Sequence, residues 1–312
     1  MRSLNSGYRV GKNVGGEQCE ALEREIEAYY DVPHARVFNS GTSALHAAIA
    51  SLGIGPGHEV IVPGYSMSAS ATCILHAGAK PVFADITDSY TLDWDDVARK
   101  TTAATRAIVL VHLFGHHATV PDGIHLPIVH DCAQSPTAHP GDYAKFASRS
   151  CDVWVYSLNQ WKIVQSGEGG YALTYGTRLA DRLHAVRNHG ECTTDDILGW
   201  NYRMTEPVAA IARREFAELD TRIAARRLWA ERFSEQYRFS DQGNIDWFLY
   251  PVRVANGDRE DVARHLGGRV GYHKPIYQLP WFQKHGYSDV RLPRVERIES
   301  ELVVVDPLKD DS

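Results

Sequence analysis

The feature that most constrains the fold of this chain is a series of short apolar runs, rich in valine and isoleucine, that alternate with helical patterns. The runs lie at residues 59–63, 80–86, 106–114, 126–131 and 151–158. They lack the regular polar alternation of a strand with one face in water, and such unbroken runs are typical of parallel strands covered by helices on both faces. Strands interleaved with helices indicate right-handed crossovers and an α/β fold.

A second pattern divides the chain of 312 residues, which is long enough for two domains. Residues 204–227 read as one long amphipathic helix, with Thr205 as its N-cap and Pro207 in its first turn. The face predicted to be buried carries Ile211, Phe216, Leu219 and Ile223. We expect this helix to lead from a large domain, residues 1–220, to a small C-terminal domain, residues 221–312.

Composition and charge exclude several classes of protein. The net charge of -6 and the pI near 6.2 argue against a general nucleic-acid surface. No apolar run approaches the roughly 18 residues of a membrane span, and the first residues lack the apolar stretch of a secretory signal, so we expect a cytoplasmic protein without a membrane segment. The five cysteines are scattered and form no CxxC pair, which predicts buried thiols: Cys19, Cys73, Cys132, Cys151 and Cys192.

Histidines raise the question of a metal site, because four of the fifteen lie close together in the sequence. They are His112, His116, His117 and His130. This segment lacks the carboxylate partners at helical spacing that a metal site would need. We therefore expect no metal.

The first stretch that carries chemistry is "NSGTSALH", residues 39–46, where a helix begins. Gly41 allows a close backbone approach, and Thr42 and Ser43 offer hydroxyl groups. The free N–H groups and the dipole of a helix N-terminus favour an anion such as phosphate. Plain helix capping is the more frequent role of such residues.

The second is Asp131, at the carboxyl end of the run 126–131. Ligands of open α/β sheets bind outside the carboxyl ends of the strands. A carboxylate there could hold a ring nitrogen in its protonated form. A salt bridge or a helix cap explains a single aspartate equally well.

The third is Lys162, which follows the run 151–158 and Ser157 and precedes the glycine-rich stretch 167–170. A lysine reacts with aldehydes once its ammonium form is destabilised, for example at an apolar site or near another cation. A solvated surface charge is the ordinary alternative. Taken together and in this order, an anion cradle, a carboxylate and an amine are what pyridoxal 5′-phosphate (PLP) requires.

The sequence resembles the fold-type I PLP enzymes and, within them, the nucleotide-sugar aminotransferases of the DegT/StrS type. The resemblance runs collinearly over roughly residues 10–225. The motifs that carry it are "SGTSALHAA" (40–48), "LGIGPGHEVIVP" (52–63), "AGAKPVFADI" (77–86), "HDCAQS" (130–135), "YSLNQWKIVQSGEGG" (156–170), "RNHG" (187–190) and "NYRMTEPVAAI" (201–211). It implies an aspartate aminotransferase-like large domain with a mostly parallel sheet, followed by a small, shortened α+β domain.

The resemblance also implies a role for each matching residue. Lys162 would bind the cofactor covalently and act as general base and acid, Asp131 would pair with the pyridine nitrogen, and Gln134 would lie near the phenolic oxygen. The phosphate would be held beside Gly41 by Thr42, Ser43, Ser157 and, from the partner subunit of a homodimer, Asn201. The substrate region would be bordered by His189, Tyr202 and Arg203.

Three departures from the family pattern bear on the substrate. Met67 occupies the position where the family usually has an aromatic residue that stacks on the pyridine ring, and Tyr65 lies close to it in sequence. A methionine can also pack on an aromatic ring. The segment between the runs 106–114 and 126–131 is too short for the usual helix, and the C-terminal region is shorter than is normal for the family.

The predicted function is transfer of an amino group from glutamate or glutamine to a keto substrate, most simply a nucleotide-linked keto-sugar. Two alternatives stay open. One is a PLP enzyme of the same scaffold with a different activity, which would be transamination of a non-sugar or polymer-linked group, decarboxylation or aldol-type cleavage. The other is a non-catalytic sensor, although such a protein has no need of Lys162, Asp131 and Ser157 together.

Overall fold

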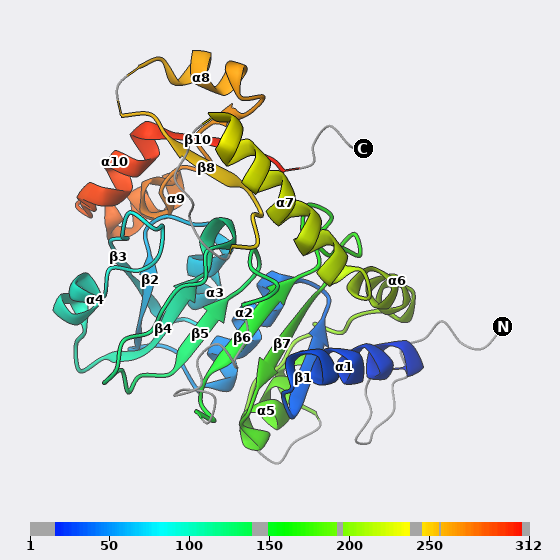
Figure 1. The fold of residues 1–312 in the computed structure, drawn as a ribbon. Coiled ribbons are helices and arrows are strands. Elements are labelled where there is room, and N and C mark those ends of the chain that lie inside the picture. The colour runs from blue at the N-terminus through cyan, green and yellow to red at the C-terminus, as the bar shows by residue number, and fades with distance from the viewer. Residues whose placement is uncertain (1–15, 139–148, 192–195, 238–244, 256, 308–312) are drawn as a thin grey trace.

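The computed structural model of the protein describes residues 16–138, 149–191, 196–237, 245–255 and 257–307. It contains a seven-stranded sheet flanked by helices and a separate three-stranded sheet near the C-terminus (Figure 1). Of the predicted cysteines, Cys192 lies outside the described residues. Cys19, Cys73 and Cys132 are buried free thiols, and Cys151 is half-buried.

The large sheet has the strand order β1-β7-β6-β5-β4-β2-β3. Strand β7 is antiparallel to both of its neighbours, and the other neighbouring pairs are parallel. The mostly parallel sheet confirms the α/β prediction. Its strands are β1 (His34–Phe38), β2 (Glu59–Pro63), β3 (Lys80–Ala84), β4 (Thr105–Val111), β5 (Ile128–Asp131), β6 (Val153–Ser157) and β7 (Gly170–Thr174).

The helices that accompany this sheet follow the predicted alternation. They are α1 (Glu17–Tyr30), α2 (Gly41–Ser51), α3 (Ala69–His76), α4 (Trp94–Lys100), α5 (Thr177–Arg187) and α6 (Glu206–Phe216). Between β4 and β5 the chain forms only a short 3-10 turn, Leu113–Gly115, which confirms that this connection has no room for a helix. Phe114 in that turn has a positive φ of 60°.

The C-terminal part of the chain builds the antiparallel sheet β8-β10-β9. Its elements are α7 (Leu219–Tyr237), β8 (Tyr250–Arg253), α8 (Arg259–His265), β9 (Arg269–Val270), α9 (Pro280–Phe282), α10 (Pro293–Glu301) and β10 (Leu302–Val305). The predicted domain boundary between residues 220 and 221 falls in the first turn of α7 and stays a prediction.

The prediction of one helix across residues 204–227 is wrong. Helix α6 ends at Phe216, and α7 begins at Leu219. The N–H of Glu218 donates to the carbonyl of Glu215, a tighter bond than the α-helical one, so the chain turns between the two helices. Helix α6 packs beside α1, whereas α7 continues to the three-stranded sheet (Figure 1).

Ile211 was also assigned to the wrong face of that helix, since 52% of it is exposed. The buried face of α6 is made by Ala209, Ala212 and Phe216 instead. The small alanines bring α6 close to α1, and the larger isoleucine is left outside. The spacing of apolar residues alone does not show which of these two faces of α6 is buried.

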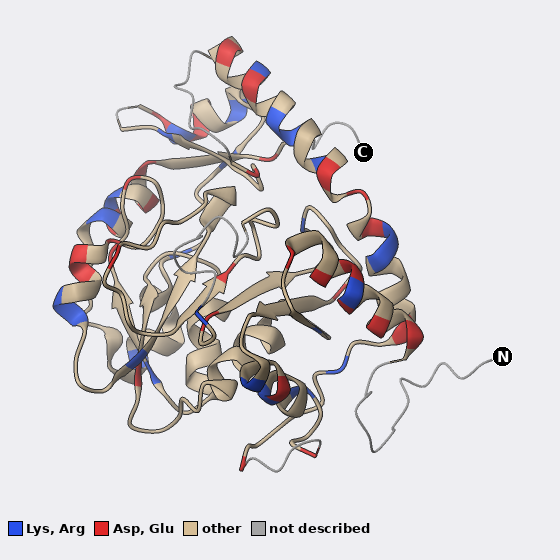
Figure 2. Ribbon diagram, turned by 60° about the horizontal axis from the view of Figure 1, so that its bottom comes forward, with Lys and Arg blue, Asp and Glu red and all other residues tan. Residues whose placement is uncertain are grey.

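Charged residues of both signs lie mainly along the helices, as Figure 2 shows. Within the described part of the chain, no helix is both long and apolar enough to cross a membrane. No cluster of three His, Cys, Asp or Glu side chains suited to a metal occurs among the same residues.

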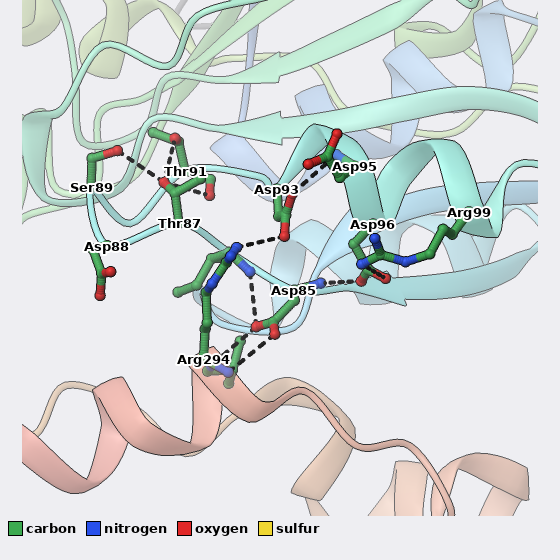
Figure 3. A network of polar contacts seen from close by, with 12 residues as sticks. Asp85, Thr87, Asp88, Ser89, Thr91, Asp93, Asp95, Asp96, Arg99 and Arg294 are labelled. Atoms are coloured by element: carbon green, nitrogen blue, oxygen red, sulfur yellow. Dashed lines mark hydrogen bonds and ion pairs between the residues drawn. The ribbon is translucent and has the colours of Figure 1, made fainter.

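The C-terminal region packs onto the large sheet through a shared apolar core and through a buried carboxylate. Val62 and Val109 of the sheet belong to the same cluster as Val295 and Val304. Asp85, which directly follows β3, accepts hydrogen bonds from the N–H groups of Arg294 (3.1 Å) and Val295 (2.9 Å) in the first turn of α10 (Figure 3). Asp85 thus caps a helix more than 200 positions away in sequence.

We predict that Asp85→Ala lowers the free energy of unfolding by about 1–2 kcal/mol, because two N–H groups of α10 lose their acceptor. Urea unfolding would measure the change. Asp88→Ala is the matched control, since Asp88 is exposed and its ion pairs with Arg297 and Arg253 therefore contribute little to stability. Equal stability of Asp85→Ala and the wild type would contradict the capping role.

Candidate functional site

A cavity of about 750 Å³ opens at the carboxyl edge of the large sheet, between that sheet and the C-terminal region. Parallel strands end together at this edge, which is where ligands of open α/β sheets bind. Seven of the residues predicted from the sequence line this one cavity: Gly41, Thr42, Met67, Asp131, Gln134, Ser157 and Lys162.

Glycines bring the N-terminus of α2 against the ends of β6 and β7. A Cβ atom on Gly170 would lie 2.6 Å from the backbone nitrogen of Gly41, a distance that real Cβ atoms do not adopt. A Cβ atom on Gly41 would lie 2.8 Å from the Cβ of Ser157. Only glycine fits at either position without displacing backbone or a neighbouring side chain.

This contact puts a helix N-terminus in the cavity wall. Helix α2 begins at Gly41, and its cap Ser40 accepts a hydrogen bond from the N–H of Ser43 (3.1 Å). The side chain of Ser43 is buried and donates to Oδ1 of Asn39 (2.5 Å), so Ser43 lies behind the wall rather than in it. The N–H groups of the first turn and the hydroxyls of Thr42 and Ser157 form a cradle suited to an anion.

Asp131 provides a buried negative group at the end of β5. It accepts hydrogen bonds from the hydroxyl of Ser70 (2.7 Å) and from the N–H of Ala133 (3.2 Å). Burial raises the pKa of Asp131, while these two hydrogen bonds and the charge of Lys162 act in the opposite direction. Such a carboxylate is stabilised by a cation placed within the cavity.

Lys162 sits in the loop between β6 and β7 and points its amine into the cavity. Its Nζ lies 4.6 Å from the ring centroid of Phe248, which comes from the C-terminal region. Burial lowers the pKa of Lys162 to about 8, and the charge of Asp131 limits this decrease. Near pH 8 a substantial fraction of the amine is therefore neutral and able to act as a nucleophile.

The loop that carries Lys162 is held by backbone hydrogen bonds across its base. The N–H of Leu158 donates to Gly169 (2.9 Å), and the N–H of Gln160 donates to Gly167 (2.9 Å). Gly167 has a φ of +82°, in the left-handed region that favours glycine. The glycines after the lysine thus close the loop and keep the amine beside the strand ends.

Gln134 connects the two regions that border the cavity. Its Oε1 accepts from the N–H of Phe114 (2.6 Å), and its Nε2 donates to the hydroxyl of Tyr272 (2.6 Å). The predicted contact of Gln134 with a phenolic oxygen stays a prediction. The structure adds that Gln134 holds Tyr272 of the C-terminal region in the cavity wall.

Met67 and Tyr65 occupy different environments. Met67 lines the cavity and is 45% exposed, whereas Tyr65 is fully buried and packs edge-on against Tyr272. Of these two residues, Met67 is therefore the one placed to contact a ligand. Its role in packing against a cofactor ring stays a prediction.

Besides Ser43, four predicted residues do not line the cavity of this chain: Asn201, His189, Tyr202 and Arg203. Asn201 and His189 are exposed. The hydroxyl of Tyr202 is hydrogen-bonded to Nδ1 of His46 (2.9 Å), and Arg203 donates to Oδ1 of Asn188 (2.7 Å). The family resemblance assigns Asn201 to the site of a partner subunit, and that assignment stays a prediction.

Sequence reasoning missed a group of cavity residues that the C-terminal region supplies: Arg226, Phe248, Arg269, Tyr272 and His273. It also missed Ser70, which orients Asp131 from α3. The last motif that carries the resemblance ends at residue 211, so no motif marked the positions in the C-terminal region. A third strand end, Val111 of β4, also lines the cavity and could have been inferred from strand order alone.

The donor set of this cavity fits PLP, the cofactor that the resemblance implies. An anion cradle at α2, the buried carboxylate of Asp131 and the amine of Lys162 face one space. These are the groups that a phosphate, a protonated ring nitrogen and an aldehyde need.

Comparison with known proteins agrees with the geometry. The sequence profile described as the DegT/DnrJ/EryC1/StrS aminotransferase family matches residues 3–309. The chain is similar to dTDP-3-amino-3,4,6-trideoxy-alpha-D-glucose transaminase of Streptomyces venezuelae, with 32% identity over 318 residues that cover 94% of this chain and 83% of the relative.

Two further matches are a relative that is named for a different substrate and a protein of known structure. L-glutamine:2-deoxy-scyllo-inosose aminotransferase of Streptomyces kanamyceticus is 35% identical over 255 residues, 74% of this chain and 59% of the relative. The crystal structure of DesV from S. venezuelae superimposes with a TM-score of 0.83 at 29% identity and covers 94% of this chain and 84% of that one. The fold is thus that of PLP fold-type I.

The pKa of Lys162 generates a prediction for the protein without cofactor. Acetylation of Lys162 by acetic anhydride should increase with pH and level off above about pH 8, because only the neutral amine reacts. In Asp131→Asn the plateau should begin at a lower pH, since the carboxylate charge that raises the pKa of Lys162 is gone.

Peptide mass spectrometry would measure the acetylation of Lys162 in the wild type and in Asp131→Asn, with the exposed Lys284 in the same digest as internal reference. A plateau in Asp131→Asn that begins at the same or a higher pH would contradict the electrostatic coupling between Asp131 and Lys162.

Proposed function

Because the chain belongs to the DegT/DnrJ/EryC1/StrS aminotransferase family, we propose that it transfers an amino group from glutamate or glutamine to a nucleotide-linked keto-sugar. Membership makes the protein a PLP-dependent aminotransferase. The observation that carries the proposal is the amine of Lys162, whose pKa is lowered to about 8, in one cavity with Asp131 and the N-terminus of α2.

When bound, PLP supplies an aldehyde that takes up the amino group and a ring that withdraws electrons from the carbon that loses a proton. Lys162 then has two roles. Its Nζ would hold the cofactor, and after release it would take the proton from the substrate carbon and return it to the former aldehyde carbon of the cofactor, on the other side of the transferred nitrogen. A pKa near the working pH suits both directions of this transfer.

The other residues would bind and orient the cofactor. Asp131, fixed by Ser70 and Ala133, would pair with a protonated ring nitrogen. The first turn of α2, Thr42 and Ser157 would hold the phosphate. Ser43 would contribute from behind, through the capping contacts that shape this turn.

The acceptor is proposed from the relatives. The S. venezuelae relative is named for a dTDP-linked amino sugar, which supports a nucleotide-sugar. A second candidate is a cyclic ketone without a nucleotide, because the S. kanamyceticus relative is named for an inosose and reaches 35% identity.

We expect a cytoplasmic homodimer with shared active sites. Asn201 is exposed in the single chain, and its backbone carbonyl accepts from Nδ2 of Asn39 (3.2 Å), just before α2. Asn201 is exposed and does not line the cavity of its own chain, which supports a role for its side chain at the site of the partner subunit. His189, Tyr202 and Arg203 belong to the same neighbourhood and would border the substrate there.

The first test is the absorbance of the protein with PLP. The wild type should show a long-wavelength band that decays when L-glutamate or L-glutamine is added and returns on addition of a keto acceptor. Lys162→Ala should lack the covalent link and this cycle, and Lys284→Ala, at an exposed lysine, should behave as wild type.

Acceptors with and without a nucleotide would be compared in the same assay. Preference for the nucleotide-linked ketone supports the proposal, and preference for the free cyclic ketone favours the second candidate. An absorbance band that does not change when either amino donor is added would contradict aminotransfer from glutamate or glutamine.

The shared site predicts complementation between two inactive variants. Lys162→Ala and Asn201→Ala, mixed and allowed to exchange subunits, should regain activity, because a heterodimer contains one site with both residues intact. With random exchange the gain should approach about one quarter of the wild-type sites. No recovery despite demonstrated exchange would show that Asn201 acts within its own subunit.

A further inference from the structure

The amine of Lys162 faces an aromatic ring rather than a polar partner. Its Nζ lies 4.6 Å from the centroid of the Phe248 ring, within the distance of about 6 Å at which the face of such a ring attracts a cation. Both side chains line the cavity, although one comes from the loop between β6 and β7 and the other from the segment before β8. Among the described residues, no hydrogen bond or ion pair engages Nζ. Phe248 thus occupies the place of a counter-group for the charged form of Lys162.

The two forms of the amine interact differently with this ring. The ammonium form is attracted by the negative face of the ring, and the attraction is strongest where water is excluded. The neutral amine carries no charge for the ring to attract. Burial acts in the opposite direction, since it lowers the pKa of Lys162 to about 8. An aliphatic side chain in place of Phe248 would therefore supply the burial without the attraction.

The backbone of Phe248 is held from two sides. Its N–H donates to the carbonyl of Phe114 in the turn after β4 (3.1 Å). In the same turn, the carbonyl of Gly115 accepts from the N–H of Asp246 (3.1 Å). From the other side, Arg226 of α7 donates to the carbonyl of Phe248 (3.3 Å). The turn and α7 together make the ring a fixed surface beside the lysine.

We propose that Phe248 is a positioning residue for the reaction: the face of its ring holds the free ammonium group of Lys162 at the strand ends while the lysine is not joined to the cofactor. This inference rests on the proposed function, in which Lys162 leaves the cofactor, takes a proton and later gives it up. Taking the proton makes the amine an ammonium group, which is the form that the ring attracts. A group that transfers a proton must stay within reach of the reacting carbon, and this contact restricts the long lysine side chain to that place.

The alternative is that Phe248 only keeps water away from Lys162, and acetylation of the protein without cofactor separates the two roles. In Phe248→Leu the apolar bulk stays and the ring is lost. A holding role predicts that the acetylation plateau of Lys162 then begins about 0.4–1.5 pH units lower than in the wild type, because the ammonium form loses its partner. If Phe248 only excludes water, the smaller leucine admits more water, and the plateau stays or moves to a higher pH.

Three further variants complete this experiment. Phe248→Tyr keeps the ring face and should keep the wild-type plateau. The matched control is Phe233→Leu on α7, which removes a buried ring that does not line the cavity and should leave the plateau unchanged. Phe248→Met, which also lacks a ring, replaces the leucine variant if thermal unfolding shows that the latter is not folded.

Single-turnover absorbance of the PLP-loaded protein gives a second readout. At a pH above both plateaus, Phe248→Leu should slow the decay of the PLP band in saturating L-glutamate by about 2- to 30-fold. The concentration of L-glutamate that gives half the maximal rate should stay unchanged, because the ring acts on the lysine and not on the donor. Phe248→Tyr should restore the rate.

A plateau of Phe248→Leu at the same or a higher pH, a shift in Phe248→Tyr as large as in Phe248→Leu, or an unchanged single-turnover rate in Phe248→Leu would each overturn the inference. Failure of the wild type to react with any amino donor would instead overturn the proposed function. Acetylation needs neither cofactor nor donor, so the two failures are distinguishable.

Discussion

The site depends on one close backbone contact, between the first residue of α2 and the first residue of β7. A side chain at position 170 would collide with the backbone of Gly41, and a side chain at position 41 would collide with Ser157. Because of this contact, the N–H groups at the start of α2 face the same cavity as the lysine loop that joins β6 to β7. An anion-binding helix end and a reactive amine, 121 positions apart in sequence as Gly41 and Lys162, thereby become one site.

The C-terminal region completes this site rather than merely covering it. Phe248 lies under the amine of Lys162, and Tyr272 is held by Gln134. The segment that carries Phe248 is itself fixed to the turn after β4: the N–H of Phe248 donates to the carbonyl of Phe114 (3.1 Å). Phe114 has a positive φ of 60°, a conformation that costs energy for a residue with a side chain. The burial that lowers the pKa of Lys162 therefore comes from both regions of the chain.

The sequence located the residues of the large sheet that line the cavity, because their positions follow local rules. Strand ends, a helix start and a glycine-rich loop each have a local pattern, and Asp131 and Lys162 stand directly in such patterns. Ser70 was not predicted, because its contact with Asp131 links the first turn of α3 to the end of β5 across the fold. Arg269 and Tyr272 were not predicted, because β9 has only two residues and neither it nor the residues after it show a periodic pattern. The break between α6 and α7 was missed because tertiary packing against α1 overrode a continuous helical pattern.

Glycine contacts create the PLP site by bringing α2 to the lysine loop, and the most direct measurement of this is the affinity for PLP of Gly170→Ala compared with Gly55→Ala. At Gly55 an added Cβ has an ordinary neighbour distance of 3.6 Å, whereas at Gly170 it meets backbone at 2.6 Å. We predict that Gly55→Ala binds PLP as the wild type does and that Gly170→Ala loses about tenfold or more, because α2 must shift. Equal affinities in a folded Gly170→Ala protein would contradict this.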